Sequence, residues 1–258
     1  MSFAKIFQRK ALLTYLCAGD PSLATTADLL KVLDDAGVDV LEVGVPFSDP
    51  IADGPVIQAA STRALAEGTT LGAILAMLGT LGTSLRAPRV LMSYVNPLAA
   101  YGFERFARDA SEAGVRGVLV PDLPFSESAD LREALGNQGV VLVPMVSPNT
   151  PEDRLATVGA ATEGFLYCVA LLGVTGDGAR LRHTVPAYLE RVRRHTRAPL
   201  ALGFGIDGPD RVRTLAPYAD GLVVGSALVS LVHRHREDRH ALRREVRTFA
   251  LALKSALR

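Results

Sequence analysis

The chain has 258 residues, of which 48% are hydrophobic, and this is enough for one large α/β domain with a continuous core. A formal net charge of +1 argues against a nucleic-acid-binding protein. No signal-peptide pattern opens the sequence, and charge, Gly or Pro interrupts every apolar run before membrane-spanning length, so we expect neither export nor a membrane protein.

Short apolar runs alternate with amphipathic stretches along the whole chain, which predicts repeated strand and helix units. Residues 1–10 allow about one helical turn. Strands are expected over residues 11–17, 38–43, 89–94, 114–120, 140–146, 164–171, 200–203 and 221–224. Helices are expected over residues 22–36, 57–67, 71–81, 103–113, 126–135, 151–158 and 185–195, from 209, and as one long helix from 226.

Eight strands alternating with helices in one chain predict a (β/α)₈ TIM barrel, with a parallel eight-stranded sheet and a single catalytic domain over residues 1–258. The last helix is rich in arginine, but acidic residues interrupt the pattern, so we expect it to form a solvated outer face. Cys17 and Cys168 lie in apolar runs without a CxxC spacing. Reduced core thiols and a cytoplasmic location are the expected result.

The stretch LEVGVPFSDPIADGP, residues 41–55, has the strongest chemical signal. Glu42 lies near the end of a strand that is otherwise apolar, where an unpaired carboxylate is costly and its pKa rises. Asp53 follows in a loop that Pro and Gly keep out of regular structure. Active sites of TIM barrels lie at the carboxyl ends of the strands, so the two carboxylates are expected to meet there.

Glycines follow the last two predicted strands, in GFGI (residues 203–206) and VGS (residues 224–226). Glycine lets backbone N–H groups approach an anion closely, and loops in this part of a TIM barrel commonly bind phosphate. Lysine occurs only at positions 5, 10, 31 and 254, away from the predicted strand ends, which disfavours a Schiff-base aldolase. All five histidines fall in or beside late helices, which disfavours a zinc aldolase. Carboxylate acid/base chemistry on a phosphorylated substrate, without a cofactor, remains.

Each candidate residue also has a structural interpretation. Glu42 could be a structural carboxylate bonded to a loop amide, and Asp53 could form an Asx-turn or a helix cap. Tyr167 could be a core residue whose hydroxyl binds a backbone carbonyl. Asp122, between Pro121 and Pro124, is expected to shape its loop rather than react.

The stretch over residues 41–55 resembles the signature of the tryptophan synthase alpha subunit family. The resemblance extends through TYLCAGDP (14–21), YVNPL (94–98), VPDLP (120–124), GVTG (173–176), GFGI and VGS. It implies retro-aldol cleavage of indole-3-glycerol phosphate to indole and glyceraldehyde 3-phosphate. It also implies a pyridoxal-phosphate beta subunit as partner, in an alpha-beta-beta-alpha heterotetramer in which a tunnel carries the indole.

The resemblance also implies roles for individual residues. Glu42 and Asp53 match the family's catalytic glutamate and aspartate, and Tyr167 matches the tyrosine that positions the glutamate. Thr175 matches a loop residue that closes on the aspartate. Apolar positions around the indole are matched by Tyr15, Met92 and Leu119, and the phosphate cradle is matched by Gly176, Gly205, Gly225 and Ser226.

Two departures from the family pattern bear on function. Ala170-Leu171-Leu172 stands where enteric-type members carry Ser-Arg-Ser, and the segment before the first strand is short, so any helix that plugs the barrel is abbreviated. The first departure leaves two alternatives open. One is a stand-alone lyase that supplies free indole to secondary metabolism, and the other is a barrel that chiefly regulates a pyridoxal-phosphate beta subunit.

Overall fold

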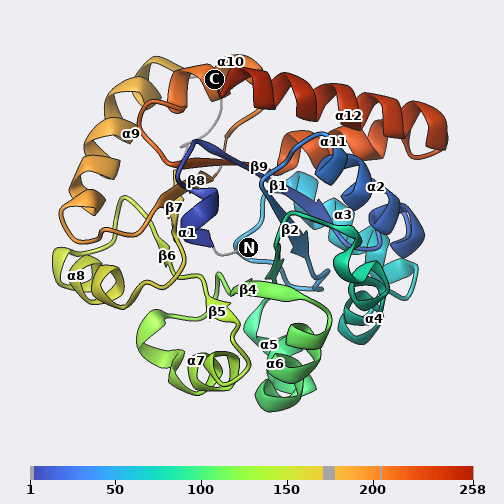
Figure 1. Cartoon of the computed structure of the whole chain (residues 1–258), viewed down its shortest axis with the longest axis horizontal. Helices are drawn as coiled ribbons and strands as arrows, with labels where there is room; N and C mark the ends of the chain where they lie inside the picture. Colours follow the sequence, from blue (N-terminus) through green and yellow to red (C-terminus); the bar gives the residue numbers. More distant parts are fainter. Residues whose placement is uncertain (1–2, 171–177, 204, 258) are drawn as a thin grey trace.

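Parallel strands at the centre and helices around them form the molecule (Figure 1). The computed structural model describes residues 3–170, 178–203 and 205–257. Its strands are β1 (Ala11–Cys17), β2 (Val40–Gly44), β3 (Arg89–Met92), β4 (Val115–Leu119), β5 (Val141–Leu142), β6 (Met145–Val146), β7 (Leu166–Val169), β8 (Leu200–Gly203) and β9 (Gly221–Val224). They pair in the order β5-β4-β3-β2-β1-β9-β8-β7-β6, which leaves β5 and β6 at the two ends of the sheet.

The two end strands are pieces of one extended segment, and this closes the sheet. Only Val143 and Pro144 separate them, and the Val143 N–H donates to the carbonyl of Val118 at 2.7 Å. The Pro144 carbonyl accepts from the Tyr167 N–H at 3.0 Å. Pro144 has no N–H for the ladder, which accounts for the break. The chain thus pairs with β4 on one side and β7 on the other, and the predicted TIM barrel of eight strand positions is confirmed.

The described helices lie outside the barrel, except for α1 (Phe3–Ile6), which lies at the centre of the ring of strands (Figure 1). The others are α2 (Leu23–Asp35), α3 (Pro55–Ala66), α4 (Leu71–Leu81), α5 (Val95–Tyr101), α6 (Phe103–Glu112), α7 (Ala129–Gly136), α8 (Glu152–Ala161), α9 (Gly178–Arg193), α10 (Pro209–Leu215), α11 (Ser226–His235) and α12 (Arg239–Ala256), with 3₁₀ turns η1 (Gly82–Ser84) and η2 (Phe125–Glu127). No single described helix has both the length and the apolar composition of a membrane span, although α3 and the segment Leu71–Ser84 would together pass that test across a bend of 92°.

One helix was missed and one was predicted wrongly. No helix was expected between residues 94 and 103, but this segment forms α5, in which Pro97 lies in the first turn, where its missing N–H is tolerated. The long helix expected from residue 226 is two helices, α11 and α12. Asp238 begins the second one, because its side chain accepts hydrogen bonds from the N–H groups of His240 and Ala241 at 2.9 and 3.0 Å.

Side chains alternate along each strand, so the sheet separates two cores. On β1, Leu12 and Leu16 pack outward against the helices, whereas Leu13 packs inside the barrel. The short α1 lies at the centre of the ring of strands (Figure 1), and its Phe3 contacts Phe165 edge-on at 5.2 Å between ring centroids. The expected abbreviated helix at the barrel bottom is therefore confirmed, and it leaves the opposite, carboxyl end open.

Two smaller predictions concern the cysteines and the last helix. Cys17 and Cys168 are buried and free, as expected. The arginine-rich face of α12 is exposed, as expected, and two of its arginines, Arg239 and Arg243, also form ion pairs with Asp28 of α2. These pairs hold α12 against the helix that follows β1.

Candidate active site

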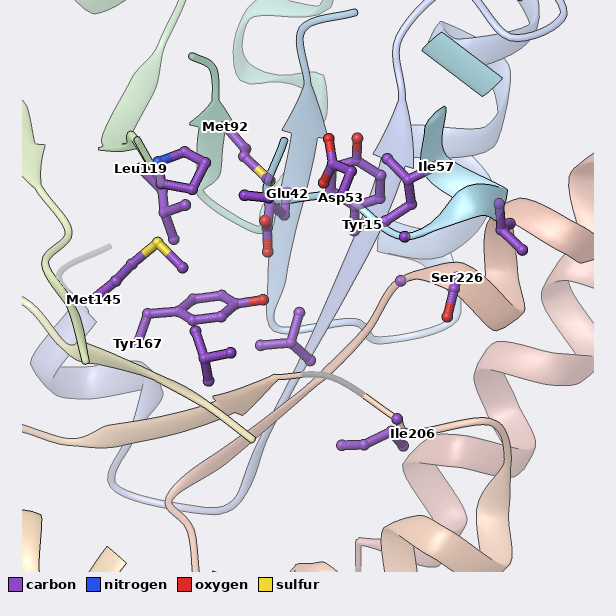
Figure 2. Close-up of a pocket in the computed structure, with 18 of the residues that line it drawn as sticks. Tyr15, Glu42, Asp53, Ile57, Met92, Leu119, Met145, Tyr167, Ile206 and Ser226 are labelled. Atoms are coloured by element: carbon purple, nitrogen blue, oxygen red, sulfur yellow. The ribbon is translucent and has the colours of Figure 1, made fainter. Parts of the chain in front are cut away.

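A cavity of about 570 Å³ opens at the carboxyl ends of the strands. Figure 2 shows acidic, phenolic and apolar side chains from several strands and loops that surround one space. Its lining consists of Tyr15, Glu42, Ile51, Ala52, Asp53, Gly54, Pro55, Val56, Ile57, Met92, Leu119, Pro121, Met145, Tyr167, Val169, Gly205, Ile206, Val223, Gly225 and Ser226. The structure therefore brings together every predicted site residue that it describes.

Glu42 extends from β2 into this cavity. Its neighbours in the sheet are Tyr15 on β1 and Val90 on β3. The residue is 2% exposed, and its carboxyl group has no hydrogen bond to any described part of the chain. The loop amide of the structural interpretation is therefore not observed. Burial, with a second contribution from the charge of Asp53, raises the pKa of Glu42 to about 8. A group in this state can donate a proton at neutral pH.

Asp53 is held above the cavity by the loop between β2 and α3. Its N–H donates to the Pro50 carbonyl at 3.0 Å, and its own carbonyl accepts from the Gln58 side chain at 2.8 Å. Gly54, not Asp53, is the N-cap of α3, so the predicted alternative of a helix cap is wrong. Burial raises the pKa of Asp53 to about 6, opposed by a hydrogen bond from Tyr94. Asp53 is mostly ionised at neutral pH.

Tyr94 is a residue beside this site to which the sequence analysis gave no role. Its hydroxyl donates to Oδ2 of Asp53 at 3.0 Å and accepts from the Ala52 N–H at 3.0 Å. Phe47, from the same loop as Asp53, stacks on the Tyr94 ring at 5.2 Å between centroids. Tyr94 lies at the exit of β3, within the YVNPL motif, so the rule about strand ends could have identified it.

Replacing Tyr94 with phenylalanine should raise the pKa of Asp53 from about 6 by roughly one unit, because a hydrogen bond that stabilises the charged carboxylate is removed. The pKa rises because the Tyr94 hydroxyl donates to the Asp53 carboxylate, and loss of this donor disfavours the ionised form of Asp53. Carbon-13 NMR of the aspartate side-chain carboxyl groups, recorded over a pH titration, measures this shift.

The matched control is Tyr218→Phe, which removes a phenol that is 42% exposed, far from the barrel interior, and should leave that titration unchanged. An Asp53 resonance that titrates at the same pH in the Tyr94 variant and the wild type would contradict the positioning role of Tyr94.

Two further tyrosines face Glu42 from either side. A Cβ atom on Gly44 would lie 2.1 Å from the hydroxyl oxygen of Tyr15, and one on Gly203 would lie 2.4 Å from that of Tyr167. Each ring therefore occupies space that only glycine leaves free. The Tyr167 hydroxyl has no backbone carbonyl as partner among the described residues, and it has no hydrogen bond to Glu42 there either. The role of Tyr167 toward Glu42 stays a prediction.

The rest of the wall is apolar. Met92 at the end of β3 and Leu119 at the end of β4 line the cavity as expected, and Met145, Ile57 and Val169 join them. The last three were not predicted. Val169 ends β7, so the rule that identified Met92 applies to it as well, whereas Met145 begins the two-residue strand β6. Together these side chains form a surface that fits a flat aromatic ring.

Glycines and a helix N-terminus form the other end of the cavity. Gly205 has a φ of +71°, which favours glycine, and Gly225 precedes α11, whose first turn has no side-chain cap. Ser226 is the first residue of that helix and lines the cavity. Free N–H groups at a helix start bind anions such as phosphate. Thr175 and Gly176, also expected in the site, lie outside the described residues.

Asp122 has the structural role that the sequence predicts. Its Oδ1 atom accepts from the N–H of Val95 at 2.9 Å, at the start of α5. This bond fixes the helix that follows Tyr94 rather than contributing to the cavity. Within residues 3–170, 178–203 and 205–257, no three His, Cys, Asp or Glu side chains gather as a metal site requires.

The chain is similar to proteins of known family. A family model described as tryptophan synthase alpha chain matches residues 1–258. The tryptophan synthase alpha chain of Pelobacter propionicus is 45% identical over 257 residues, covering 99% of this chain and 96% of that protein. The crystal structure of tryptophan synthase subunit alpha from Legionella pneumophila superposes with a TM-score of 0.91 at 32% identity, covering 100% of this chain and 98% of that one. An aminoacrylate-bound tryptophan synthase from M. tuberculosis gives a TM-score of 0.87 at 30% identity, with 99% of both chains covered.

Proposed function

The chain belongs to the tryptophan synthase alpha chain family, and from this premise we propose that its rim cavity cleaves indole-3-glycerol phosphate to indole and glyceraldehyde 3-phosphate with Glu42 and Asp53 as the reacting carboxylates. The observation that carries the assignment of these residues is the state of Glu42. It is a buried carboxyl group without a hydrogen bond to any described residue, placed between an apolar wall and a glycine-rich cradle.

Protonated Glu42 gives its proton to C3 of the indole, which places positive charge on the ring system. Glu42, now ionised, removes the proton from the hydroxyl group on the carbon next to C3. The electrons of that O–H bond form the aldehyde, and those of the broken carbon–carbon bond restore the indole. Glu42 is protonated again at the end, so the cycle needs no outside acid, base or cofactor.

Asp53 and the cradle hold the two ends of the substrate. Tyr94 bonds Oδ2 of Asp53, and no described residue bonds Oδ1, which can accept the indole N–H and offset the positive charge on the ring. Met92 and Leu119 pack against the indole. Phosphate at Gly225 and Ser226 fixes the glycerol chain, so the reacting carbon stays at Glu42.

The chain pairs with a tryptophan synthase beta subunit, as an alpha chain does. We propose the alpha-beta-beta-alpha heterotetramer as the assembly, the cytoplasm as its location, and residues 1–258 as one catalytic domain. The single sheet and the continuous outer core support the last point. The chain departs from the family pattern at Ala170-Leu171-Leu172, and Leu171 and Leu172 lie outside the described residues. Activity should therefore be compared with and without the beta subunit.

Purified chain should release indole from indole-3-glycerol phosphate with a bell-shaped pH dependence. The reactive form has Asp53 ionised and Glu42 protonated, so kcat/KM should rise as pH passes the Asp53 pKa of about 6 and fall as it passes the Glu42 pKa of about 8. Indole formation measured spectrophotometrically from pH 5 to 9 tests both limbs.

The same titration with a cognate beta subunit present shows whether the partner changes the rate. Strong activation supports the tryptophan synthase assembly, whereas full turnover by the isolated chain would favour a stand-alone lyase. If the wild-type chain released no indole under either condition, the proposed function would be wrong.

A further inference from the structure

Tyr15 lies at the carboxyl ends of the strands, where the glycerol part of the substrate has to pass between Glu42 and the phosphate cradle. In the sheet, β1 stands between β2, which carries Glu42, and β9, which leads to Gly225 and Ser226. Tyr15 is paired in register with Glu42, and a Cβ atom on Gly225 would lie 3.5 Å from the Tyr15 Cβ. A molecule with its reacting carbon at Glu42 and its phosphate at Ser226 therefore passes over Tyr15.

The hydroxyl of Tyr15 has no hydrogen-bond partner within the described residues, although the residue is only 5% exposed and lines the cavity. Other buried phenols in this protein behave differently. The Tyr188 hydroxyl donates to the Val146 carbonyl at 2.8 Å, and the Tyr94 hydroxyl takes part in two hydrogen bonds. Because Tyr15 lines the cavity and its hydroxyl is not tied to a described residue, that hydroxyl is suited to a partner that a ligand brings.

The surroundings keep this phenol neutral and able to donate. The absence of a side chain on Gly44 makes room for the hydroxyl, since a Cβ there would lie 2.1 Å from its oxygen. Burial raises the pKa of Tyr15 well above its usual value, and negative charge on Cys17, Asp53 and Glu42 acts in the same direction. An acceptor oxygen in the cavity would thus meet an O–H group at all relevant pH values.

We propose that the Tyr15 hydroxyl donates a hydrogen bond to a hydroxyl oxygen of the glycerol chain, so that Tyr15 recognises the chain that is cleaved as well as the indole. The inference rests on the proposed cleavage of indole-3-glycerol phosphate. From the sequence, Tyr15 is expected to be an apolar contact of the indole. Under this proposal the ring of Tyr15 still forms part of the apolar wall, and its hydroxyl adds a hydrogen bond to the glycerol chain.

The Tyr15→Phe variant tests this with two ligands. One is indole-3-glycerol phosphate, and the other is indole-3-propanol phosphate, which has the same ring, chain length and phosphate but neither glycerol hydroxyl. We expect kcat/KM for the first to fall about 5- to 10-fold, as the loss of one hydrogen bond predicts. The Kd of the second, measured by calorimetry, should change by less than about twofold, because the ring of the phenylalanine preserves the wall.

Tyr188→Phe is the matched control, since it removes a buried phenol outside the cavity. It should leave both ligand measurements within about twofold of wild type, whatever it does to thermal stability. The inference is overturned if Tyr15→Phe leaves kcat/KM for indole-3-glycerol phosphate unchanged. It is also overturned if the Kd of indole-3-propanol phosphate rises by the same factor as this kcat/KM falls. A wild-type chain that releases no indole would instead reject the proposed function, so the two failures are distinguishable.

Discussion

Replacing Glu42 with glutamine should lower kcat for indole release by at least about 10³-fold, because one carboxyl group performs both proton transfers and each contributes on the order of 10² to 10⁴. Glutamine keeps the shape of the side chain but cannot donate or remove the proton. Substrate affinity should change little, since it depends on the cradle and the apolar wall. Single-turnover indole formation and equilibrium binding of substrate measure the two quantities separately.

Glu67→Gln is the control for this substitution, because Glu67 is an exposed glutamate at the end of α3, outside the cavity. It should retain wild-type activity. Turnover by the Glu42 variant within about tenfold of wild type would be far above what loss of an acid/base group allows, and it would remove Glu42 from the mechanism.

The same substitution should stabilise the fold at neutral and alkaline pH. The folded-state pKa of Glu42, about 8, lies above the value in the unfolded chain, so the unfolded chain loses this proton first and stability falls as pH rises toward 8. Glutamine does not titrate, so the free energy of unfolding of the variant should exceed that of the wild type by roughly 3 to 4 kcal/mol at pH 7 to 8 and by almost nothing near pH 4. Urea unfolding at both pH values measures the gain. A variant no more stable than wild type at pH 8 would contradict the view that burial raises the pKa of Glu42.

Elements set by local pattern could be predicted from sequence, whereas those set by distant partners could not. The predicted bounds of the strand Ala11–Cys17 were confirmed, because its apolar run ends at turn residues. The helix α5 was missed because Asn96-Pro97 is typical of a turn, and its first N–H is satisfied by Asp122 from another strand end. The break in the strand over residues 140–146 likewise depends on pairing with two different neighbours.

The residues of the site also fall into those that local sequence identifies and those whose role depends on distant contacts. Glu42 and Asp53 could be identified because a carboxylate in an apolar strand and a second one in a Pro/Gly loop are visible in one short stretch. The position of Tyr94 at a strand end was visible too, but its hydrogen bond to Asp53 was not, since that bond forms only when the loop carrying Asp53 reaches the end of β3 and places Phe47 against the Tyr94 ring. That no described residue bonds the Tyr15 hydroxyl was also not visible, because the sequence does not say which phenols find a partner.

Asp53→Asn should lower kcat by about 10² to 10³, the usual cost of removing a group that stabilises charge as it develops. Asparagine can still accept the indole N–H, so binding of the substrate should weaken far less than turnover. The distinctive effect concerns Glu42, because the charge of Asp53 contributes to the high pKa of Glu42. Removing that charge should move the alkaline limb of the pH profile to lower pH.

Asp49→Asn separates this coupling from a general effect on the loop, since Asp49 is an exposed carboxylate four positions earlier that does not line the cavity. With the isolated chain, this control should keep both kcat and the alkaline limb. An Asp53 variant whose kcat falls while its alkaline limb stays in place would mean that Asp53 binds the ring without sensing the charge on Glu42. Electrostatic coupling of the two carboxylates would then have to be abandoned, because burial alone would set the acidity of Glu42.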